Sequence, residues 1–395
     1  MKRRKIAFVV QRYGLEVNGG AEYHCRLLAE RLNEIYHIDV ITTCAVDYLS
    51  WKNEYDEGME VLNGINVYRF PSQTRDINQF NKFSSAVLFN PYHSWENELE
   101  WINKQGPNSP KLLEFLIENE RNYDVVIFFT YLYYTTYYGL QLVPQKSILV
   151  PTAHDEPPIY LKAYRPLFHL PRWIMFNTYE EQRFIHKLFQ NSYISSEVVG
   201  VGVDIVHERS AERFREKYNL GKERFILYIG RIDESKGCGE LFDYVLRYNQ
   251  ESSTPLKLVL LGKQHMNIPS DPNILPLGFV TEQEKWDALE AADLLVMPSK
   301  YESLSMVVLE SMAVGKPVLV NGNCDVLWGH CIKSNAGLYY RNYEEFQGCL
   351  KYLMERSDIV KGLGLNGKRY VYENYQWETI IKKYERAIEF VVNRA

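Results

Sequence analysis

Short runs of apolar, β-branched and aromatic residues alternate along the chain with stretches in which apolar residues recur at helical spacing. Each short run ends near a turn or a helix pattern, which is typical of a buried strand. Strands that alternate with helices favour a parallel α/β sheet, because each crossover helix returns the chain to the same sheet edge. The strands predicted in the first half are 6–10, 38–43, 124–129, 147–150 and 173–176.

The same alternation starts again in the second half, after residues 200–205. The chain is therefore predicted to contain two doubly wound α/β halves that join there. Neither half has a GxGxxG turn after its first strand, so a dinucleotide site is not favoured. The strands predicted in the second half are 224–230, 256–262, 293–298 and 317–322.

The helix predicted in residues 19–35 has an apolar stripe that suits packing on the first sheet. The stripe consists of Ala21, Cys25, Leu28, Leu32 and Ile35. Residues 71–112 are predicted to be a long irregular segment, either a binding loop or a surface elaboration. The tyrosine-rich residues 128–139 are expected mainly in the core, with sugar stacking as the alternative.

Composition narrows the class of protein. The chain has 395 residues, of which 46% are hydrophobic and 24% charged, so two globular domains are expected. The formal net charge of −5 gives no reason to expect nucleic-acid binding. There is no long apolar run or signal-peptide pattern, so a cytoplasmic protein is expected. The six cysteines form no CxxC pair and are expected to be structural rather than disulfide-bonded or metal-binding.

Three motifs follow predicted strands and suit binding of a polar ligand. Gly19 and Gly20 precede the first helix, where backbone N–H groups favour an anion, although such pairs also occur in ordinary turns. Arg231 and Lys236 follow the strand that ends at Gly230, and a diphosphate would relieve their crowding; the alternative is a solvated surface pair. His154 follows another strand and could donate to a substrate oxygen, or be structural.

The residues PSKYESLSMVVLESMAVGKPV, 298–318, place two acids around an apolar stretch. A turn is predicted at 299–303 and a helix from about Leu304 to Val314. The neighbours of Glu310 on that helix are apolar, so its side chain must meet hydrogen-bond donors such as ligand hydroxyls, or a salt-bridge partner. Glu302 lies before the helix, where the turn can direct it toward a ligand.

Taken in order, these motifs resemble the family 4 retaining glycosyltransferases of the GT-B fold, glycosyl transferases group 1. The similarity covers nearly the whole chain and includes the glycine pair, HD after a strand, GRxxxxKG and PSxxExxxxxxxExxAxGKPV. It implies two Rossmann-like domains that face a cleft. The implied domains are an acceptor-side domain, 1–202, completed by the last helix, 376–395, and a nucleotide-sugar-binding domain, 203–375.

The resemblance implies transfer of a sugar from a nucleotide-sugar donor to a saccharide or lipid-linked acceptor, in surface polysaccharide or glycoconjugate synthesis. Arg231 and Lys236 would bind the diphosphate, Glu302 and His154 would lie at the sugar, and Glu310 would accept ribose hydroxyls. His154, Arg231, Lys236 and Glu302 are the implied catalytic residues. The implied donor-binding residues are Gly19, Gly20, Gly230, Phe279, Val280, Leu304, Ser305, Met306, Val307 and Glu310.

The chain departs from the family at Ser305, where a glycine is usual, and this makes the donor sugar uncertain. No DxD motif is present, so no metal or cofactor is expected, and a front-face retaining route is favoured over a covalent intermediate. The competing functions are a sugar-nucleotide epimerase of the same fold and a non-catalytic sugar-nucleotide-binding protein. Residues 160–173, basic and aromatic, either touch the inner face of a membrane or pack between elements, and packing is favoured.

Overall fold

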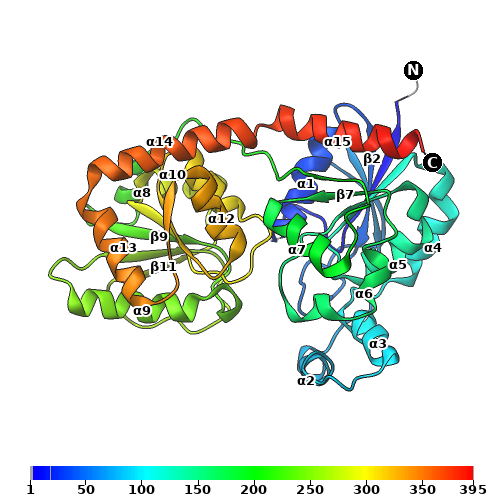
Figure 1. Cartoon of the computed structure of the whole chain (residues 1–395), viewed down its shortest axis with the longest axis horizontal. Helices are drawn as coiled ribbons and strands as arrows, with labels where there is room; N and C mark the ends of the chain where they lie inside the picture. The colour runs from blue at the N-terminus through cyan, green and yellow to red at the C-terminus, as the bar shows by residue number, and fades with distance from the viewer. Residues whose placement is uncertain (1–2, 18, 395) are drawn as a thin grey trace. The chain divides into compact units, whose positions relative to one another are not determined.

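A computed structural model describes residues 3–17 and 19–394 of the chain. These residues divide into two compact units, unit 1 (Met1–Val201 with Glu378–Ala395) and unit 2 (Gly202–Trp377). In each unit helices cover both faces of a mostly parallel sheet (Figure 1). The α/β class predicted from the alternating pattern is confirmed.

Unit 1 is built on an eight-stranded sheet with the order β3-β4-β2-β1-β5-β6-β7-β8. Every pairing is parallel except that of β3 with β4. The central strands β1 and β5 are apolar almost throughout because both of their faces are covered. The strands are β1 Lys5–Val9, β2 His37–Thr43, β3 Gly58–Leu62, β4 Ile65–Phe70, β5 Val125–Phe129, β6 Ser147–Val150, β7 Trp173–Phe176 and β8 Ser196–Val198.

The prediction that residues 71–112 are irregular was wrong, because α2, α3 and the start of α4 lie there. Each helix has a local start signal: Asp76 caps α2, Ser94 and Asn97 form a capping box, and Pro110 is the first residue of α4. The unit 1 helices are α1 Gly20–Leu32, α2 Ile77–Leu88, α3 Trp95–Gln105, α4 Pro110–Asn119, α5 Tyr134–Leu142, α6 Tyr164–Leu167, α7 Tyr179–Phe189 and α15 Trp377–Val392.

Two further expectations for unit 1 need correction. Strands β3 and β4 were not predicted, although Asn63 and Gly64 between them both have positive φ, as a two-residue hairpin turn requires. In the first helix Cys25, Leu28 and Leu32 are buried as expected, but Ile35 lies beyond the end of α1 and is 40% exposed. The tyrosine-rich segment is mainly core, as predicted: Tyr131, Tyr134 and Tyr137 are buried.

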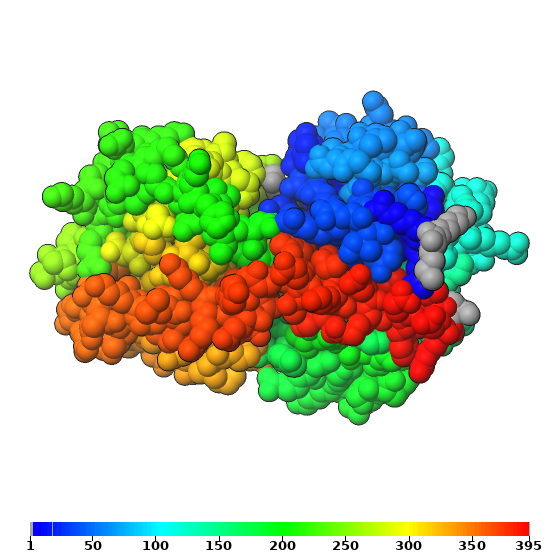
Figure 2. Space-filling view, turned by 90° about the horizontal axis from the view of Figure 1, so that it is seen from above, coloured from blue at the N-terminus to red at the C-terminus, as the bar shows by residue number. Residues whose placement is uncertain are grey.

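The last helix, α15, returns to unit 1. Its side chains bond to the N-terminal strand region and to β8: Arg4 pairs with Glu389, and Arg386 with Glu197 at 2.5 Å. Figure 2 shows α15, in red, lying between the blue N-terminal residues and the green segment of the same unit. The helix therefore closes one side of the unit 1 sheet.

Unit 2 has a six-stranded parallel sheet with the order β11-β10-β9-β12-β13-β14. The chain runs outward from β9 and then crosses back to β12, so the order reverses between these two strands. The elements are α8 Ala211–Lys217, β9 Phe225–Ile229, α9 Cys238–Glu251, β10 Lys257–Leu261, β11 Ile274–Gly278, α10 Glu282–Ala291, β12 Leu294–Met297, α11 Met306–Ala313, β13 Val318–Asn321, α12 Asp325–Ser334, β14 Gly337–Tyr340, α13 Tyr343–Glu355 and α14 Ser357–Asn374.

Candidate functional site

The reversal of strand order in unit 2 brings the loops after β9 and β12 together. In open α/β sheets such a crevice, outside the carboxyl ends of the strands, is the usual ligand site. The two loops touch at Gly237, where a Cβ would lie only 2.5 Å from the carbonyl oxygen of Pro298. Lys236 of one loop bonds to Glu302 of the other, with 2.7 Å between Nζ and Oε1.

Arg231 lies in the same β9 loop. Its side chain is 35% exposed and approaches Asp233 at 3.5 Å, while its carbonyl oxygen accepts the hydroxyl of Tyr228 at 2.6 Å. Gly230 before it has φ +154°, and a Cβ on Gly262 of the next loop would lie 1.9 Å from the Gly230 carbonyl oxygen. Both cations are thus partly exposed, and each lies near a carboxylate on a tightly packed backbone.

The turn between Glu302 and α11 explains why Ser305 is unusual. Ser305 is buried and has φ 63°, a left-handed conformation that favours glycine and is strained for serine. The preceding carbonyl, of Leu304, accepts a 2.7 Å hydrogen bond from Nε2 of His330 on α12. His330 is fully buried, so this histidine holds the turn in place. Its role was not predicted, since its partner is 26 residues away.

Helix α11 begins at Met306, two residues later than predicted. Leu304 and Ser305 are buried before it, whereas Met306 and Val307 in its first turn are half-buried. The side chain of its N-cap residue, Ser305, makes no capping hydrogen bond, and its first turn contains no acid. The amino end of α11 therefore suits a ligand phosphate, because backbone N–H groups and the helix dipole point there.

Glu310 lies in the middle of α11 and is 5% exposed. Its Oε1 atom bonds to Nζ of Lys285 on α10 at 2.8 Å, so the salt-bridge alternative is present in the structure. Its Oε2 atom is buried and has no hydrogen-bond partner among the residues that the structure describes. A buried carboxylate oxygen without a donor is costly, which leaves room for ligand hydroxyls as well.

Phe279 and Val280 connect β11 to α10. The backbone N–H of Gly262, after β10, donates to the carbonyl of Gly278 at 2.8 Å, so the ends of β10 and β11 lie side by side. Phe279 is 74% exposed and Val280 is half-buried. Both therefore lie at the same sheet edge as Gly230, with Lys285 one turn further along α10.

His154 of unit 1 follows β6 and contacts an acid two residues further along the chain. Nε2 of His154 lies 3.3 Å from Oε2 of Glu156. The other oxygen of Glu156 accepts the hydroxyl of the fully buried Tyr131 at 2.8 Å. The carboxylate of Glu156 therefore fixes the imidazole, and Tyr131 fixes the carboxylate.

Backbone strain marks this same edge of unit 1. Thr130, after β5, and Thr152, after β6, have φ 65° and φ 48°, which are rare values for β-branched residues. Their hydroxyls bond to each other at 3.1 Å. Strain of this kind clusters at functional sites, and the sequence gives no signal for it.

A buried acid supports the loop that carries His154. Glu181 is 2% exposed and accepts the backbone N–H groups of Ala153 and Asn177, each at 2.6 Å. Burial raises the pKa of this carboxyl to about 8, against the lowering effect of these hydrogen bonds. Glu181 was not predicted, although Thr178 and Glu181 have the spacing of a capping box.

Gly19 and Gly20 lie at the start of α1. A Cβ on Gly19 would lie 2.1 Å from Oε2 of Glu22, whereas a Cβ on Gly20 would meet nothing within 4 Å. The Glu22 carboxylate is 6% exposed, pairs with Arg12 and accepts Nε2 of Gln11 at 2.8 Å. This helix terminus therefore already carries an anion of the chain's own.

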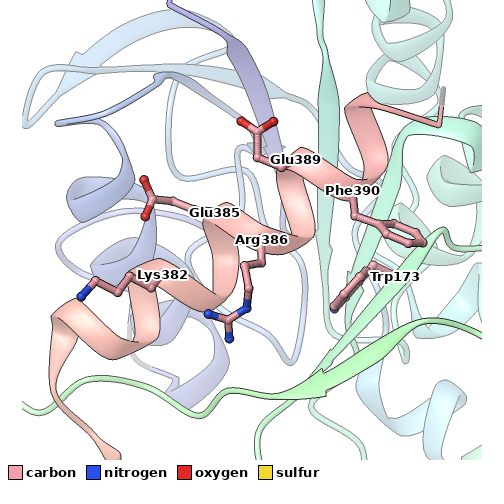
Figure 3. A pocket seen from close by; sticks show the side chains of 6 residues that line it. All are labelled: Trp173, Lys382, Glu385, Arg386, Glu389 and Phe390. Atoms are coloured by element: carbon pink, nitrogen blue, oxygen red, sulfur yellow. The ribbon is translucent and has the colours of Figure 1, made fainter.

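A hollow of about 620 Å³ lies elsewhere on unit 1, between the first residue of β7 and α15. Figure 3 shows the rings of Trp173 and Phe390 turned toward each other, and their centroids are 4.8 Å apart. Because Trp173 begins β7, the hollow lies at the amino ends of the strands, opposite the edge with His154. Its lining residues are Trp173, Lys382, Glu385, Arg386, Glu389 and Phe390.

Residues 160–173 pack into unit 1 as favoured: Tyr164, Leu167 and Phe168 are fully buried, while Lys162 and Arg165 are exposed. None of the helices in residues 3–17 and 19–394 is long and apolar enough to span a membrane. Within those ranges, no group of three or more His, Cys, Asp or Glu side chains is placed to hold a metal ion.

The sequence is similar to those of known glycosyltransferases. Residues 210–327 match the family model of glycosyl transferases group 1. An uncharacterized glycosyltransferase of Methanocaldococcus jannaschii, MJ1607, is 24% identical over 412 residues, covering 96% of each chain.

Solved structures show the same architecture. Sucrose-phosphate synthase from Thermosynechococcus elongatus aligns with TM-score 0.72 and 16% identity over 100% of both chains. Anabaena Alr3699/HepE, in complex with UDP and glucose, aligns with TM-score 0.70 and 13% identity over 98% of this chain and 100% of that one.

The two units have the GT-B fold of these solved structures. By the segment 210–327 and by a relative that spans nearly its whole length, the chain is similar to the glycosyl transferases of group 1.

Proposed function

We propose that this glycosyltransferase is a family 4 retaining enzyme that transfers a sugar from a nucleotide-sugar donor to a saccharide or lipid-linked acceptor. The observation that carries the proposal is the contact of Lys236 with Glu302 across the strand-order reversal of unit 2. A cation and an acid held together at this point suit a leaving diphosphate and a sugar hydroxyl, respectively.

Unit 2 supplies the donor site in this proposal. Arg231, Lys236 and the uncapped amino end of α11 take the diphosphate, and Glu310 accepts hydrogen bonds from the ribose. Phe279 and Val280 offer backbone groups and an exposed ring to the base. One related structure, Alr3699/HepE, is described in complex with UDP and glucose, which supports a nucleotide-sugar donor here.

Unit 1 supplies acceptor recognition. Glu22 already satisfies the amino end of α1, so Gly19 and Gly20 suit an uncharged, hydroxylated acceptor group better than a phosphate. His154, fixed by Glu156, offers a hydrogen bond to a reacting oxygen. We place the enzyme in the cytoplasm, in the synthesis of a surface polysaccharide or glycoconjugate.

The transfer follows a front-face route in this proposal. The bond between the anomeric carbon and the diphosphate oxygen breaks, the acceptor oxygen attacks from the same face, and its proton passes to the leaving diphosphate. Arg231 and Lys236 stabilise the charge that develops on that diphosphate. No metal ion is required, because the cations and the helix dipole neutralise the leaving group.

A panel of UDP-, GDP- and ADP-sugars tests the proposal. We expect one donor to raise the unfolding temperature and to be slowly hydrolysed in excess chelator, with the released sugar first appearing in the donor's anomeric configuration by NMR. An inverted product would refute retention, and rescue only by Mg²⁺ or Mn²⁺ would refute metal independence. Conversion of UDP-N-acetylglucosamine to an epimer would favour the epimerase alternative.

A further inference from the structure

Lys285 of α10 lies buried against the carboxylate of Glu310. The exposed fractions of the two side chains are 12% and 6%, and Nζ of Lys285 lies 2.8 Å from Oε1 of Glu310. The same ammonium is 2.9 Å from Oε2 of Glu282, one turn earlier on α10, whose side chain is 64% exposed. Lys285 therefore joins an exposed acid to a buried one.

The two oxygens of Glu310 have different environments. Oε1 accepts the Lys285 hydrogen bond, whereas Oε2 is buried and has no protein partner in the described part of the chain. A carboxylate can accept up to about four hydrogen bonds, so this one is under-satisfied. Its second oxygen is left for a ligand donor.

We propose that Lys285 is a positioning residue for donor binding: it holds one oxygen of Glu310 and keeps that carboxylate ionised, so that the other oxygen accepts the ribose hydroxyls. The inference rests on the proposed function, because it requires Glu310 to meet the nucleotide. An ionised acceptor makes stronger hydrogen bonds to hydroxyls than a protonated one, since the latter keeps less acceptor capacity.

Charges around Glu310 support this role. Burial raises the pKa of its carboxyl, and the ammonium of Lys285 opposes that rise. The carboxylate of Glu282, like burial, raises the pKa of the Glu310 carboxyl. Strands β12 and β13 pack against α11 and contain no ionisable residue. Helix α14 also packs against α11, and its Lys368 lies beside Gly315, just after the end of α11. The other α10 acids facing cations are Glu284, with Lys217, Asp287, with Arg213, and Glu290, with Arg209.

A ligand-free experiment tests the coupling. Unfolding midpoints are measured from pH 5 to pH 8 for the wild type, Lys285→Met, Glu310→Gln and the double variant. In Lys285→Met the carboxyl of Glu310 should have a higher pKa in the folded chain than in the unfolded chain. The stability of this variant should therefore be greatest at low pH and fall as pH rises. Glu310→Gln should remove this added pH dependence. If Lys285→Met follows the wild-type profile, the inference is overturned.

A binding experiment tests the function. Calorimetry gives the Kd of UDP, GDP and ADP for the wild type, and then for the variants with the nucleotide that binds. Lys285→Met should weaken binding roughly tenfold at pH 6.5, with a smaller factor at pH 8 where more Glu310 is ionised. Lys285→Arg should restore affinity to within about threefold, because it restores the charge. Lys217→Met is the control. It removes the exposed partner of Glu284, which lies on α10 as Lys285 does, and should change Kd less than about twofold.

The outcomes separate the inference from the proposed function. If Glu310→Gln weakens binding and Lys285→Met does not, the positioning role is refuted while the donor site stands. If the wild type binds none of the three nucleotides, both fail. A Lys285→Met defect that does not change with pH would also contradict the ionisation argument.

Discussion

Helices α1 and α11 start at the carboxyl edges of their respective sheets, yet their amino ends differ. α1 has an acid of its own there: Glu22 lies against Gly19 and pairs with the buried Arg12. α11 has no acid in its first turn, and its N-cap residue Ser305 makes no side-chain capping hydrogen bond. An anion can add to the second terminus but must displace a built ion pair at the first. The difference supports the proposal that the phosphate binds at α11 rather than at α1.

The largest expected effect is a loss of kcat when a cation is removed from the proposed diphosphate site of unit 2. Lys236→Met should lower kcat by about 10³-fold, which is about 4 kcal/mol of transition-state stabilisation. Donor turnover under saturating conditions measures it. Lys300→Met removes an exposed lysine from the neighbouring loop, and a comparable loss there would indicate a general electrostatic effect instead.

The ion pair at α1 is expected to be structural. Glu22→Gln removes the charge that compensates the buried Arg12 and should lower the free energy of unfolding by about 2–3 kcal/mol, without changing nucleotide affinity. Denaturant unfolding and calorimetry measure the two quantities. Glu30→Gln, in the last turn of α1, is the control and should cost less than about 0.5 kcal/mol. Weaker nucleotide binding by Glu22→Gln would contradict the contrast between the helices.

An acid can be added to α11 to make it resemble α1. Ser305→Asp should weaken nucleoside diphosphate binding about tenfold, because it places a negative charge where the phosphate is expected. Ser305→Asn has nearly the same shape and also tolerates left-handed backbone, so it should bind almost as the wild type does. Equal affinities of the two variants would show that the phosphate lies elsewhere.

The smallest expected effect is a change of stability with pH, and it follows from a comparison of the buried acids Glu181 and Glu310. Glu310 has Lys285 as a partner, whereas Glu181 accepts backbone N–H groups and its pKa is raised to about 8 by burial. Because the folded pKa lies above the unfolded value of about 4.3, Glu181 stabilises the fold fully below pH 4.3, and this contribution is lost as pH rises through 8.

The stability difference between wild type and Glu181→Gln should therefore shrink from pH 5 to pH 8.5. Unfolding midpoints at both pH values measure it. Glu180→Gln, at the adjacent position, should give a difference that does not change with pH. If the stability difference between wild type and Glu181→Gln widens as pH rises, the carboxyl of Glu181 is ionised in the folded wild type.

Local pattern predicted the central strands well and the edges poorly. Continuous apolar runs marked β1, β5, β9 and β12, since strands covered on both faces need them. The largely exposed β3 and the half-buried β8 lack such runs and were missed. Residues 71–112 lack a long apolar run as well, but the local start signals at Asp76, Ser94 and Pro110 begin three helices there.

The class of fold and the motifs around Lys236, Glu302 and Glu310 could be read from the sequence, because they depend on strand ends and helix starts that are local in the chain. The partners of these residues are visible only in the folded chain. Lys285 is 25 residues from Glu310, His330 is 26 residues from Leu304, and Lys236 is 66 residues from Glu302. The left-handed backbone of Ser305 likewise depends on contacts made across the sheet edge. Such pairings follow from strand order, which no local periodicity encodes.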